Sequence, residues 1–240
     1  MKSDVDLNQK PQPAALSPNT QNREEFSLTV LLALNIITLF FVSPLIDING
    51  SNRWILNLFI AMSAVVSIFV VDNGIRRWMA VLSLGFCMIG VAVGPLVADK
   101  KASAVILMVS ALIFSCNVCW IVASRVFASG PVSRHRIRGA IVIYLNIALV
   151  FALLGSLLVL FVPGAYSNLP KNSLNQLDGM IYFSLSTITT VGYGDLTPVH
   201  PLARSLAMLE AVAGQFYIAI LIGTLVSQFV SKKRTENFLD

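Results

Sequence analysis

One polar stretch of the sequence, TTVGYGDLTP at residues 189–198, lies between two long apolar segments. Within it, Gly192 and Gly194 alternate with Val191 and Tyr193. Glycine permits left-handed backbone dihedrals that other side chains oppose, so this alternation predicts a backbone whose successive carbonyls turn to one side. Rings of such oxygens can replace the hydration shell of a monovalent cation. One chain supplies a quarter of each ring, which implies four copies around an axis.

The preceding segment, residues 177–189 (LDGMIYFSLSTIT), is apolar but too short to cross a bilayer, since a spanning helix needs about 20 residues. Because longer apolar segments flank it, we expect it to enter the membrane as a short helix and return. Irregular backbone is tolerated at membrane depth only where it is buried in protein or lines water. The motif is therefore expected beside an aqueous pathway, where the C-terminal end of the short helix directs partial negative charge toward a cation.

The composition of the chain is typical of a membrane protein. Of its 240 residues 56% are hydrophobic and 12% are charged, whereas soluble domains have about 25% charged residues. We predict an all-α membrane protein with six transmembrane helices, a re-entrant pore helix and a filter loop, assembled as a tetramer. The segments long and apolar enough to span are residues 27–46, 54–71, 78–98, 103–124, 139–162 and 203–230.

The distribution of lysine and arginine predicts the orientation, because cytoplasmic loops carry an excess of both. Twelve of the 17 fall on the side that holds both termini. Both termini are therefore expected in the cytoplasm, with the chain in the inner (plasma) membrane. The basic residues cluster at the ends of the spans, which favours anionic lipid at the cytoplasmic face as a partner and gives no reason to expect nucleic acid.

These features divide the chain into five parts. Residues 1–26 are polar and rich in Pro, Asn and Gln, and they are predicted to form a disordered cytoplasmic tail. Residues 27–124 hold the first four spans, and residues 125–138 form a basic cytoplasmic linker. The unit that contains the motif covers residues 139–232, and residues 233–240 form a second cytoplasmic tail.

The residues YFSLSTITTVGYGDLTP resemble the pore loop of prokaryotic potassium channels, and MLEAVAGQFYIAILIGTLV resembles the inner helix of the same family. The resemblance covers roughly residues 140–232. It implies a homotetrameric pore that conducts K⁺ passively and needs no cofactor apart from the permeant ion. It also implies that Gly194 and Asp195 close the outer mouth and that the Thr190 hydroxyl lines the innermost site. The implied K⁺ ligands are the carbonyls of Thr190, Val191, Gly192 and Tyr193.

Two features depart from the pattern of the best-known two-helix bacterial channel. Tyr182 and Phe183 stand in place of its paired tryptophans, and Ser186 stands in place of a glutamate behind the filter. We expect Tyr182 to hydrogen-bond to Asp195 and to brace the filter. The pairing of two carboxyl groups behind the filter cannot form at Ser186, so the resemblance implies selectivity but not inactivation behaviour.

The last span contains two glycines of interest. Gly214 follows Gly194 at a distance where the family often has a flexible inner-helix glycine. We expect Gly214 to be the bending point of a gate, and close packing against a neighbouring helix is the alternative. Gly223 is a second candidate for the hinge.

Glu210 places a carboxyl group inside the last span, where a charge is costly unless it is paired or faces water. We expect it to support the filter by hydrogen bonds to pore-helix hydroxyls such as Thr187 or Ser184. The alternatives are a pH-sensing role and a charge that faces the cavity.

The fourth span, residues 103–124, contains no lysine or arginine, whereas a voltage sensor needs several basic residues there. Strong voltage gating is therefore not expected. Two other classes of protein come into question. The first is a transporter subunit, but transporters with channel-like loops usually repeat the loop four times in one chain. The second is a sensory or scaffolding protein with a vestigial pore, but such a protein has no need of an unbroken motif.

The sequence gives no support to an enzyme. His135 and His200 lie near opposite membrane faces, and no nucleophile or metal cluster accompanies either. Cys116 and Cys119 form a C-x-x-C pair without a second ligand pair, so we expect them to be buried small side chains and not a metal or redox site.

Overall fold

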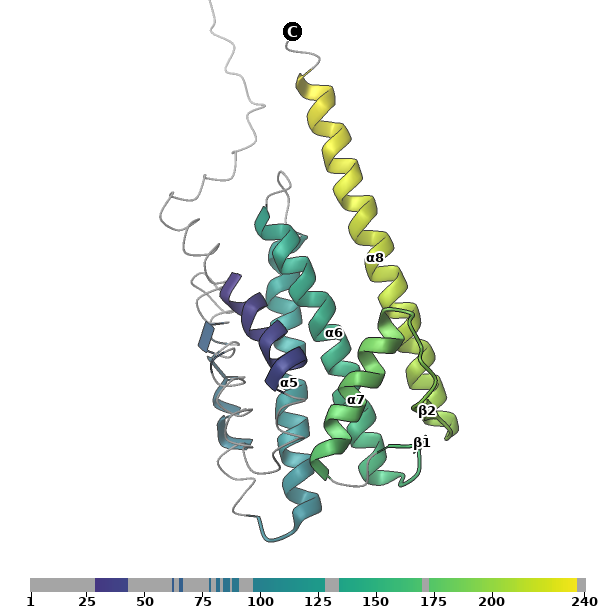
Figure 1. Cartoon of the computed structure of the whole chain (residues 1–240). Helices are drawn as coiled ribbons and strands as arrows, with labels where there is room; N and C mark the ends of the chain where they lie inside the picture. The colour runs from purple at the N-terminus through teal and green to yellow at the C-terminus, as the bar shows by residue number, and fades with distance from the viewer. Residues whose placement is uncertain are drawn as a thin grey trace, which may run out of the picture.

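The computed structural model describes residues 29–42, 97–127, 134–169 and 173–236, together with scattered residues between 62 and 90. It is almost entirely helical (Figure 1). A helix that begins at Thr29 continues into the π-helix η1. In chain order the elements are η1 (Thr38–Val42), α5 (Lys100–Val126), α6 (Arg134–Phe161), β1 (Tyr166–Ser167), α7 (Ser173–Ile188), β2 (Thr197–Pro198) and α8 (Pro201–Glu236).

Among the described residues, 3 helices are long and apolar enough to cross a membrane. They coincide with the last three spans expected from the sequence and cover Lys101–Ser124, Arg136–Phe161 and Pro201–Thr224. The expected span 27–46 coincides with a shorter apolar helix at Thr29–Phe41. The expected spans 54–71 and 78–98, like the tail 1–26, lie wholly or largely outside the described residues.

The helices extend beyond the boundaries expected from apolar content. Helix α6 begins at Arg134 and α5 ends at Val126, so both ends of the expected linker 125–138 are helical. Helix α8 likewise continues to Glu236, past the expected start of the tail at residue 233. Lysine and arginine are good helix formers, and backbone hydrogen bonding does not stop where apolar side chains end.

Helix α7 also begins earlier than expected, at Ser173 and not at residue 177. The residues before Leu177 are mostly polar, so apolar content alone does not place them in the helix. They still complete the first turn of a helix whose later turns are apolar.

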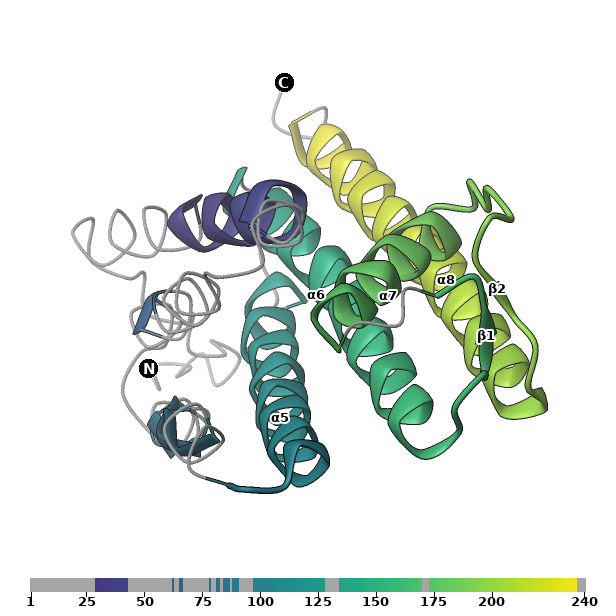
Figure 2. The same ribbon diagram turned by 60° about the horizontal axis from the view of Figure 1, so that its bottom comes forward.

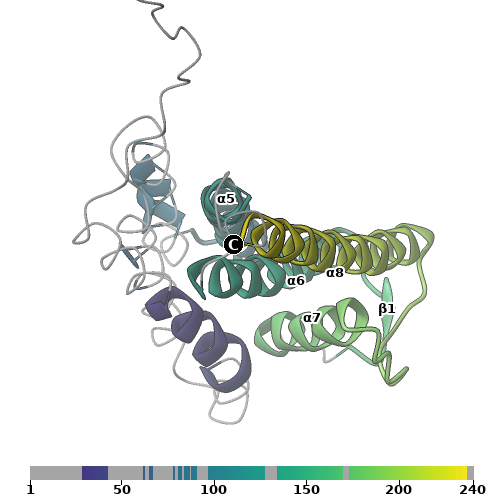
Figure 3. The same ribbon diagram turned by 90° about the horizontal axis from the view of Figure 1, so that it is seen from above.

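Helix α6 is the centre of the packing and contacts α5, α7 and α8. Figure 2 and Figure 3 show it between α5 and α7, with α8 alongside. The Met180 side chain of α7 occupies the space beside Gly155 of α6, where a Cβ atom would collide with Met180 Cε. The pore helix expected from the sequence is thus held against the outer helix α6.

Polar side chains connect three helices inside the apolar bundle. The Ser115 hydroxyl of α5 donates to Asn146 Oδ1 of α6 at 3.0 Å. Asn146 Nδ2 in turn donates to Asn35 Oδ1 of the first helix at 3.2 Å. All three side chains are buried. Hydrogen bonds of this kind contribute modestly to helix association in membranes, about 0.6 kcal/mol on average.

A short antiparallel ribbon closes the base of the loop that carries the motif. Tyr166 of β1 pairs with Pro198 of β2, and Ser167 pairs with Thr197. The carbonyl of Ala165 also accepts hydrogen bonds from the backbone amides of residues 199 and 200, at 2.9 and 3.1 Å. The chain that leaves α6 is thereby fastened to the chain that enters α8, with α7 and the motif between them.

Candidate cation site in the filter loop

The backbone of the motif alternates in handedness. Thr190, Gly192 and Gly194 have φ values of 64°, 54° and 79°, so every second residue is left-handed. This is the alternation that a row of carbonyls on one side of the chain requires. Glycine adopts such dihedrals readily. Threonine does so rarely because its side chain is β-branched, and the conformation of Thr190 is therefore strained.

The amide groups of the motif turn back toward the end of α7. The amide of Thr190 donates to the carbonyl of Thr187 at 3.0 Å, and the amide of Gly192 donates to the carbonyl of Ser186 at 3.1 Å. These donors are thus satisfied within the chain. The loop is anchored to α7 through these two amides.

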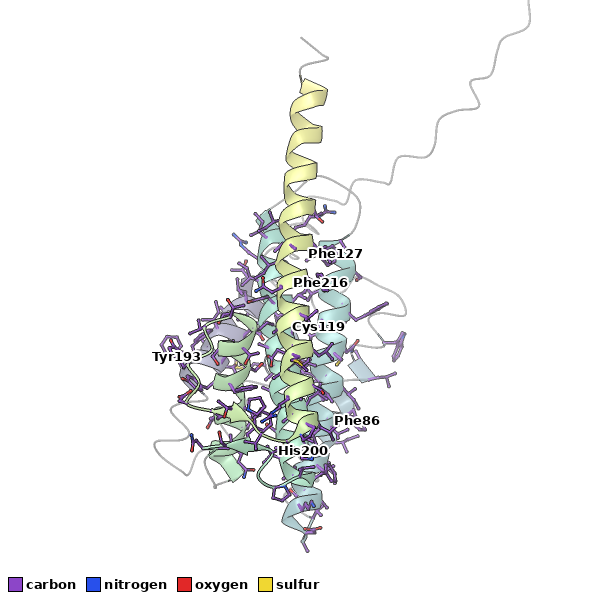
Figure 4. The ribbon with its side chains drawn as sticks, turned by 90° about the vertical axis from the view of Figure 1, so that its right-hand side faces the viewer. Phe86, Cys119, Phe127, Tyr193, His200 and Phe216 are labelled. Atoms are coloured by element: carbon purple, nitrogen blue, oxygen red, sulfur yellow. The ribbon has the colours of Figure 1, made fainter. Side chains whose placement is uncertain are left out.

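The side chains of the motif are exposed in the single chain. Val191 is 53% exposed and Tyr193 is 70% exposed. Figure 4 shows the Tyr193 side chain at the edge of the molecule, on the side of the filter loop. Two large side chains next to the strained loop are therefore left uncovered by the described part of the chain.

The outer end of the motif is held by Asp195. The Tyr182 hydroxyl donates to Asp195 Oδ2 at 2.9 Å, which is the contact expected from the sequence. The Tyr182 ring also stacks on Tyr193, with centroids 5.9 Å apart and planes 7° from parallel. The second carboxyl oxygen accepts from the amide of Leu196 at 2.9 Å. Asn168 Nδ2 donates to the backbone carbonyl of Asp195 at 2.8 Å, a contact that the sequence did not indicate.

Tyr166 supports α7 from the ribbon. Its ring packs edge-on against Phe183, with centroids 5.2 Å apart and an interplanar angle of 71°. Burial raises the pKa of Tyr166 to about 12, so its hydroxyl stays neutral under physiological conditions. Phe183, which stands where the resemblance suggested a tryptophan, thus fills an apolar contact that requires no hydrogen-bond donor.

Behind the motif, Glu210 is buried against α7. The Ser184 hydroxyl contacts Glu210 Oε1 and also lies 2.5 Å from the carbonyl oxygen of Ala148. Both side chains are almost fully buried, at 1% exposure for Ser184 and 2% for Glu210. The structure therefore places Glu210 beside Ser184, one of the two hydroxyls considered from the sequence. Thr187 contributes its backbone carbonyl to the filter loop instead.

Ser186 faces its own helix. Its hydroxyl donates to the carbonyl of Phe183 at 2.9 Å, a bond within α7. Its contact with the motif is made by its backbone carbonyl, which accepts from Gly192. The resemblance implied a glutamate side chain at this position. In this chain, Ser186 instead supports the filter loop through a main-chain hydrogen bond.

The two glycines of α8 have different surroundings. A Cβ atom at Gly214 would lie 2.5 Å from Ile188 Cγ1 and 3.0 Å from the Ile188 carbonyl oxygen, so α8 packs closely on the end of α7 at this point. A Cβ atom at Gly223 would have nothing within 4 Å among the residues that the structure describes. Close packing gives a reason for glycine at 214 that is independent of bending.

The other candidate groups do not gather at a site. His200 lies in the turn before α8, where its Nδ1 accepts from the amide of Leu202 at 3.3 Å (Figure 4). Cys119 is half-buried but Cys116 is exposed, so the expectation of burial is wrong for Cys116, whose position on α5 faces outward. The described part of the chain contains no group of three His, Cys, Asp or Glu side chains able to hold a metal.

Two tyrosines in the spans make contacts that sequence reasoning missed. The Tyr144 hydroxyl donates to the carbonyl of Ile188 at 2.9 Å, and the Tyr217 hydroxyl donates to the carbonyl of Ala140 at 2.7 Å. Both residues lie in apolar runs, where an aromatic ring is expected simply to pack. The available signal was the hydroxyl itself, because a tyrosine in an apolar environment usually requires a hydrogen-bond partner.

Comparison with known proteins places this site in context. Residues 139–231 match the model of a family described as ion channel (Ion_trans_2). The potassium voltage-gated channel protein shk-1 of Caenorhabditis elegans is 34% identical over 85 residues, which cover 34% of this chain and 16% of the relative. The calcium-gated potassium channel TvoK of Thermoplasma volcanium is 36% identical over 69 residues, covering 29% of this chain and 20% of the relative.

A third relative is the probable potassium channel protein 2 of Methanocaldococcus jannaschii, 37% identical over 59 residues, which cover 25% of this chain and 17% of the relative. The chain thus spans a fifth or less of the length of these relatives. The residues that match the family model hold most of α6 and α8 and all of α7 and the filter loop. In this region, and on these grounds, the chain is similar to an ion-channel family whose curated relatives include potassium channels.

Proposed function

We propose that this chain is one subunit of a potassium-selective channel that conducts K⁺ passively. The observation that carries the proposal is the alternation of left-handed residues at Thr190, Gly192 and Gly194. The amides of Thr190 and Gly192 bond to carbonyls of α7, which supports the assignment of the carbonyls of the loop as the ligands of a dehydrated cation. K⁺ is the permeant ligand, and no cofactor takes part. The carbonyl ligands are those of Thr190, Val191, Gly192 and Tyr193.

The channel is a homotetramer. One chain presents one row of carbonyls, which is insufficient to surround an ion, and the neighbouring Val191 and Tyr193 side chains are left uncovered. Helix α8 also carries an exposed apolar face. Three further copies around one axis would complete the oxygen rings and cover these side chains. The exposed apolar residues of α8 include Leu202, Leu209, Val212, Phe216 and Ile220.

The complete chain crosses the plasma membrane six times, with both termini in the cytoplasm and basic loops at anionic lipid. The excess of lysine and arginine on that side supports this orientation. The channel is not strongly voltage-gated, because the apolar stretch of α5 lacks the charges that a voltage sensor moves. The gating stimuli in the names of the relatives belong to those proteins.

The proposal is tested by ion flux into liposomes. Purified protein is reconstituted into vesicles loaded with K⁺, and uptake of a tracer cation is measured after external K⁺ is replaced by Na⁺. We expect tracer K⁺ to accumulate and tracer Na⁺ to remain outside. Equal accumulation of both ions, or of neither, would contradict the proposal.

A further inference from the structure

The pore helix ends in a buried backbone carbonyl that the hydrogen bonds within the filter loop do not use. Helix α7 ends at Ile188, which is 0% exposed. The last four carbonyls of a helix have no partner within the helix, and a buried carbonyl without a partner costs about 1–3 kcal/mol. The Tyr144 hydroxyl of α6 donates to the Ile188 carbonyl at 2.9 Å and supplies this partner.

The position of the Tyr144 ring is set by α8. Tyr144 stacks on Tyr217, with centroids 5.9 Å apart and planes 29° from parallel. The Tyr217 hydroxyl donates to the carbonyl of Ala140, one helical turn before Tyr144 on α6. The stacked ring of Tyr217 therefore supports the Tyr144 ring, and the bond from the Tyr217 hydroxyl to Ala140 is a separate contact between α8 and α6.

The same peptide group is approached from α8 as well. Gly214 packs so closely on Ile188 that a Cβ atom would lie 3.0 Å from its carbonyl oxygen. The peptide after Ile188 is therefore held by the Tyr144 hydroxyl and packed closely against α8 at Gly214. Two residues later the chain must enter the strained left-handed conformation of Thr190, which persists only if its surroundings hold it.

We propose that Tyr144 is a positioning residue for the inner end of the filter. It touches no ion. Its hydroxyl fixes the carbonyl of Ile188, and this fixes the direction in which the chain enters the row of cation ligands at Thr190. The role rests on the proposed function, because it requires that the loop bind K⁺. A membrane-interface anchor is a poorer account, because Tyr144 lies well inside the span Arg136–Phe161 and its hydroxyl is satisfied by protein.

The experiment compares Tyr144→Phe with Tyr217→Phe in the full-length oligomer. Both changes remove one hydroxyl and keep the stacked rings, but only the first removes a bond to Ile188. The oligomer is heated at a series of K⁺ concentrations, with Na⁺ replacing K⁺ so that the ionic strength is constant. The readout is the midpoint, which is the K⁺ concentration that gives half-maximal protection against dissociation. A lost hydrogen bond in each subunit is expected to raise this midpoint at least about fivefold for Tyr144→Phe. The midpoint of Tyr217→Phe is expected to stay within about twofold of the wild type, whatever its overall stability.

The outcomes separate the two proposals. Suppose that K⁺ protects the wild-type oligomer, but the midpoint is unchanged for Tyr144→Phe or rises equally in both variants. This result overturns the role of Tyr144 and leaves the proposed function standing. A wild-type oligomer that responds equally to K⁺ and Na⁺ overturns the proposed function and this inference with it. If Tyr144→Phe does not assemble, 3-fluorotyrosine at position 144 replaces it. Its more acidic hydroxyl is a stronger donor, so a lowered midpoint supports the proposal and an unchanged or raised one contradicts it.

Discussion

Ser184 lies between Glu210 and the carbonyl of Ala148, and its hydroxyl is within hydrogen-bond reach of both oxygens. The three groups belong to α7, α8 and α6 respectively. A hydroxyl has one proton and a carbonyl has none, so both contacts are satisfied when the Glu210 carboxyl itself carries a proton. A neutral carboxyl also avoids the large cost of a buried unpaired charge. Glu210 then connects the inner helix to the pore helix as a hydrogen-bond donor.

The first prediction concerns this proton. Glu210→Gln replaces a protonated carboxyl by an amide that can also donate to Ser184, so we expect assembly and thermal stability close to those of the wild type. Glu210→Ala removes the donor and leaves a cavity, and it should cost about 1–3 kcal/mol per subunit. Thermal dissociation of the purified oligomer measures both. If glutamine is as damaging as alanine, Glu210 is charged in the folded protein and the assignment of the proton is wrong.

The second prediction concerns the outer brace. Tyr182→Phe removes the hydroxyl that donates to Asp195 but keeps the ring that stacks on Tyr193. We expect a less stable conducting filter, seen as a lower open probability in single-channel recordings. Ser186→Ala is the matched control, because its hydroxyl bonds only within α7. Equal open probabilities in the wild type and Tyr182→Phe would show that the bond to Asp195 does not hold the filter open.

The third prediction distinguishes packing from bending at Gly214. Gly214→Ala forces a methyl group against Ile188, so we expect lower thermal stability, by about 1–3 kcal/mol, because an overpacked contact must shift. Gly223→Ala meets open space and should leave stability unchanged or raise it slightly, since alanine favours the helix. A Gly214→Ala oligomer with wild-type stability and a changed open probability would support the hinge expected from the sequence.

The fourth prediction concerns the left-handed glycines. A Cβ atom at Gly192 would have no described atom of the chain within 4 Å. The change Gly192→Ala is therefore opposed by the φ of 54° at this residue. The cost is about 1–2 kcal/mol per subunit, and we expect K⁺-selective flux to fall at least tenfold as the carbonyls turn. Gly164 provides the control, because it is also left-handed, at φ 81°, and has open surroundings outside the motif. Similar flux in the two variants would argue that the alternation of dihedrals has no part in conduction.

The sequence was most informative where backbone conformation depends on residue type. The alternation of glycines indicated the left-handed residues 192 and 194, and the resemblance to the pore loop of potassium channels implied the contact between Tyr182 and Asp195. It gave no hint that Thr190 would also be left-handed, because threonine disfavours this conformation and only the surrounding hydrogen bonds impose it. Three of the expected spans were recognisable from apolar length alone.

What the sequence could not provide was the pairing of side chains between helices. The partners of Tyr144 and Tyr217 lie on other helices, and each accepting group is a backbone carbonyl that no local pattern identifies. The buried carboxyl of Glu210 was the exception, because its position in an apolar span indicated a hydroxyl partner such as Ser184. Helix ends were also misplaced, because the polar first turns of α6 and α7 do not differ in composition from a loop. These features follow from tertiary packing, which one sequence does not reveal.

The central claim is that four sets of carbonyls bind a bare K⁺ ion. The most direct test is the reversal potential of the open channel, measured with K⁺ on one side of a planar bilayer and Na⁺ on the other. A tenfold preference corresponds to about 59 mV for a monovalent ion. We expect a shift of at least this size in the direction that favours K⁺. A reversal potential near zero in an open, conducting channel would contradict the account.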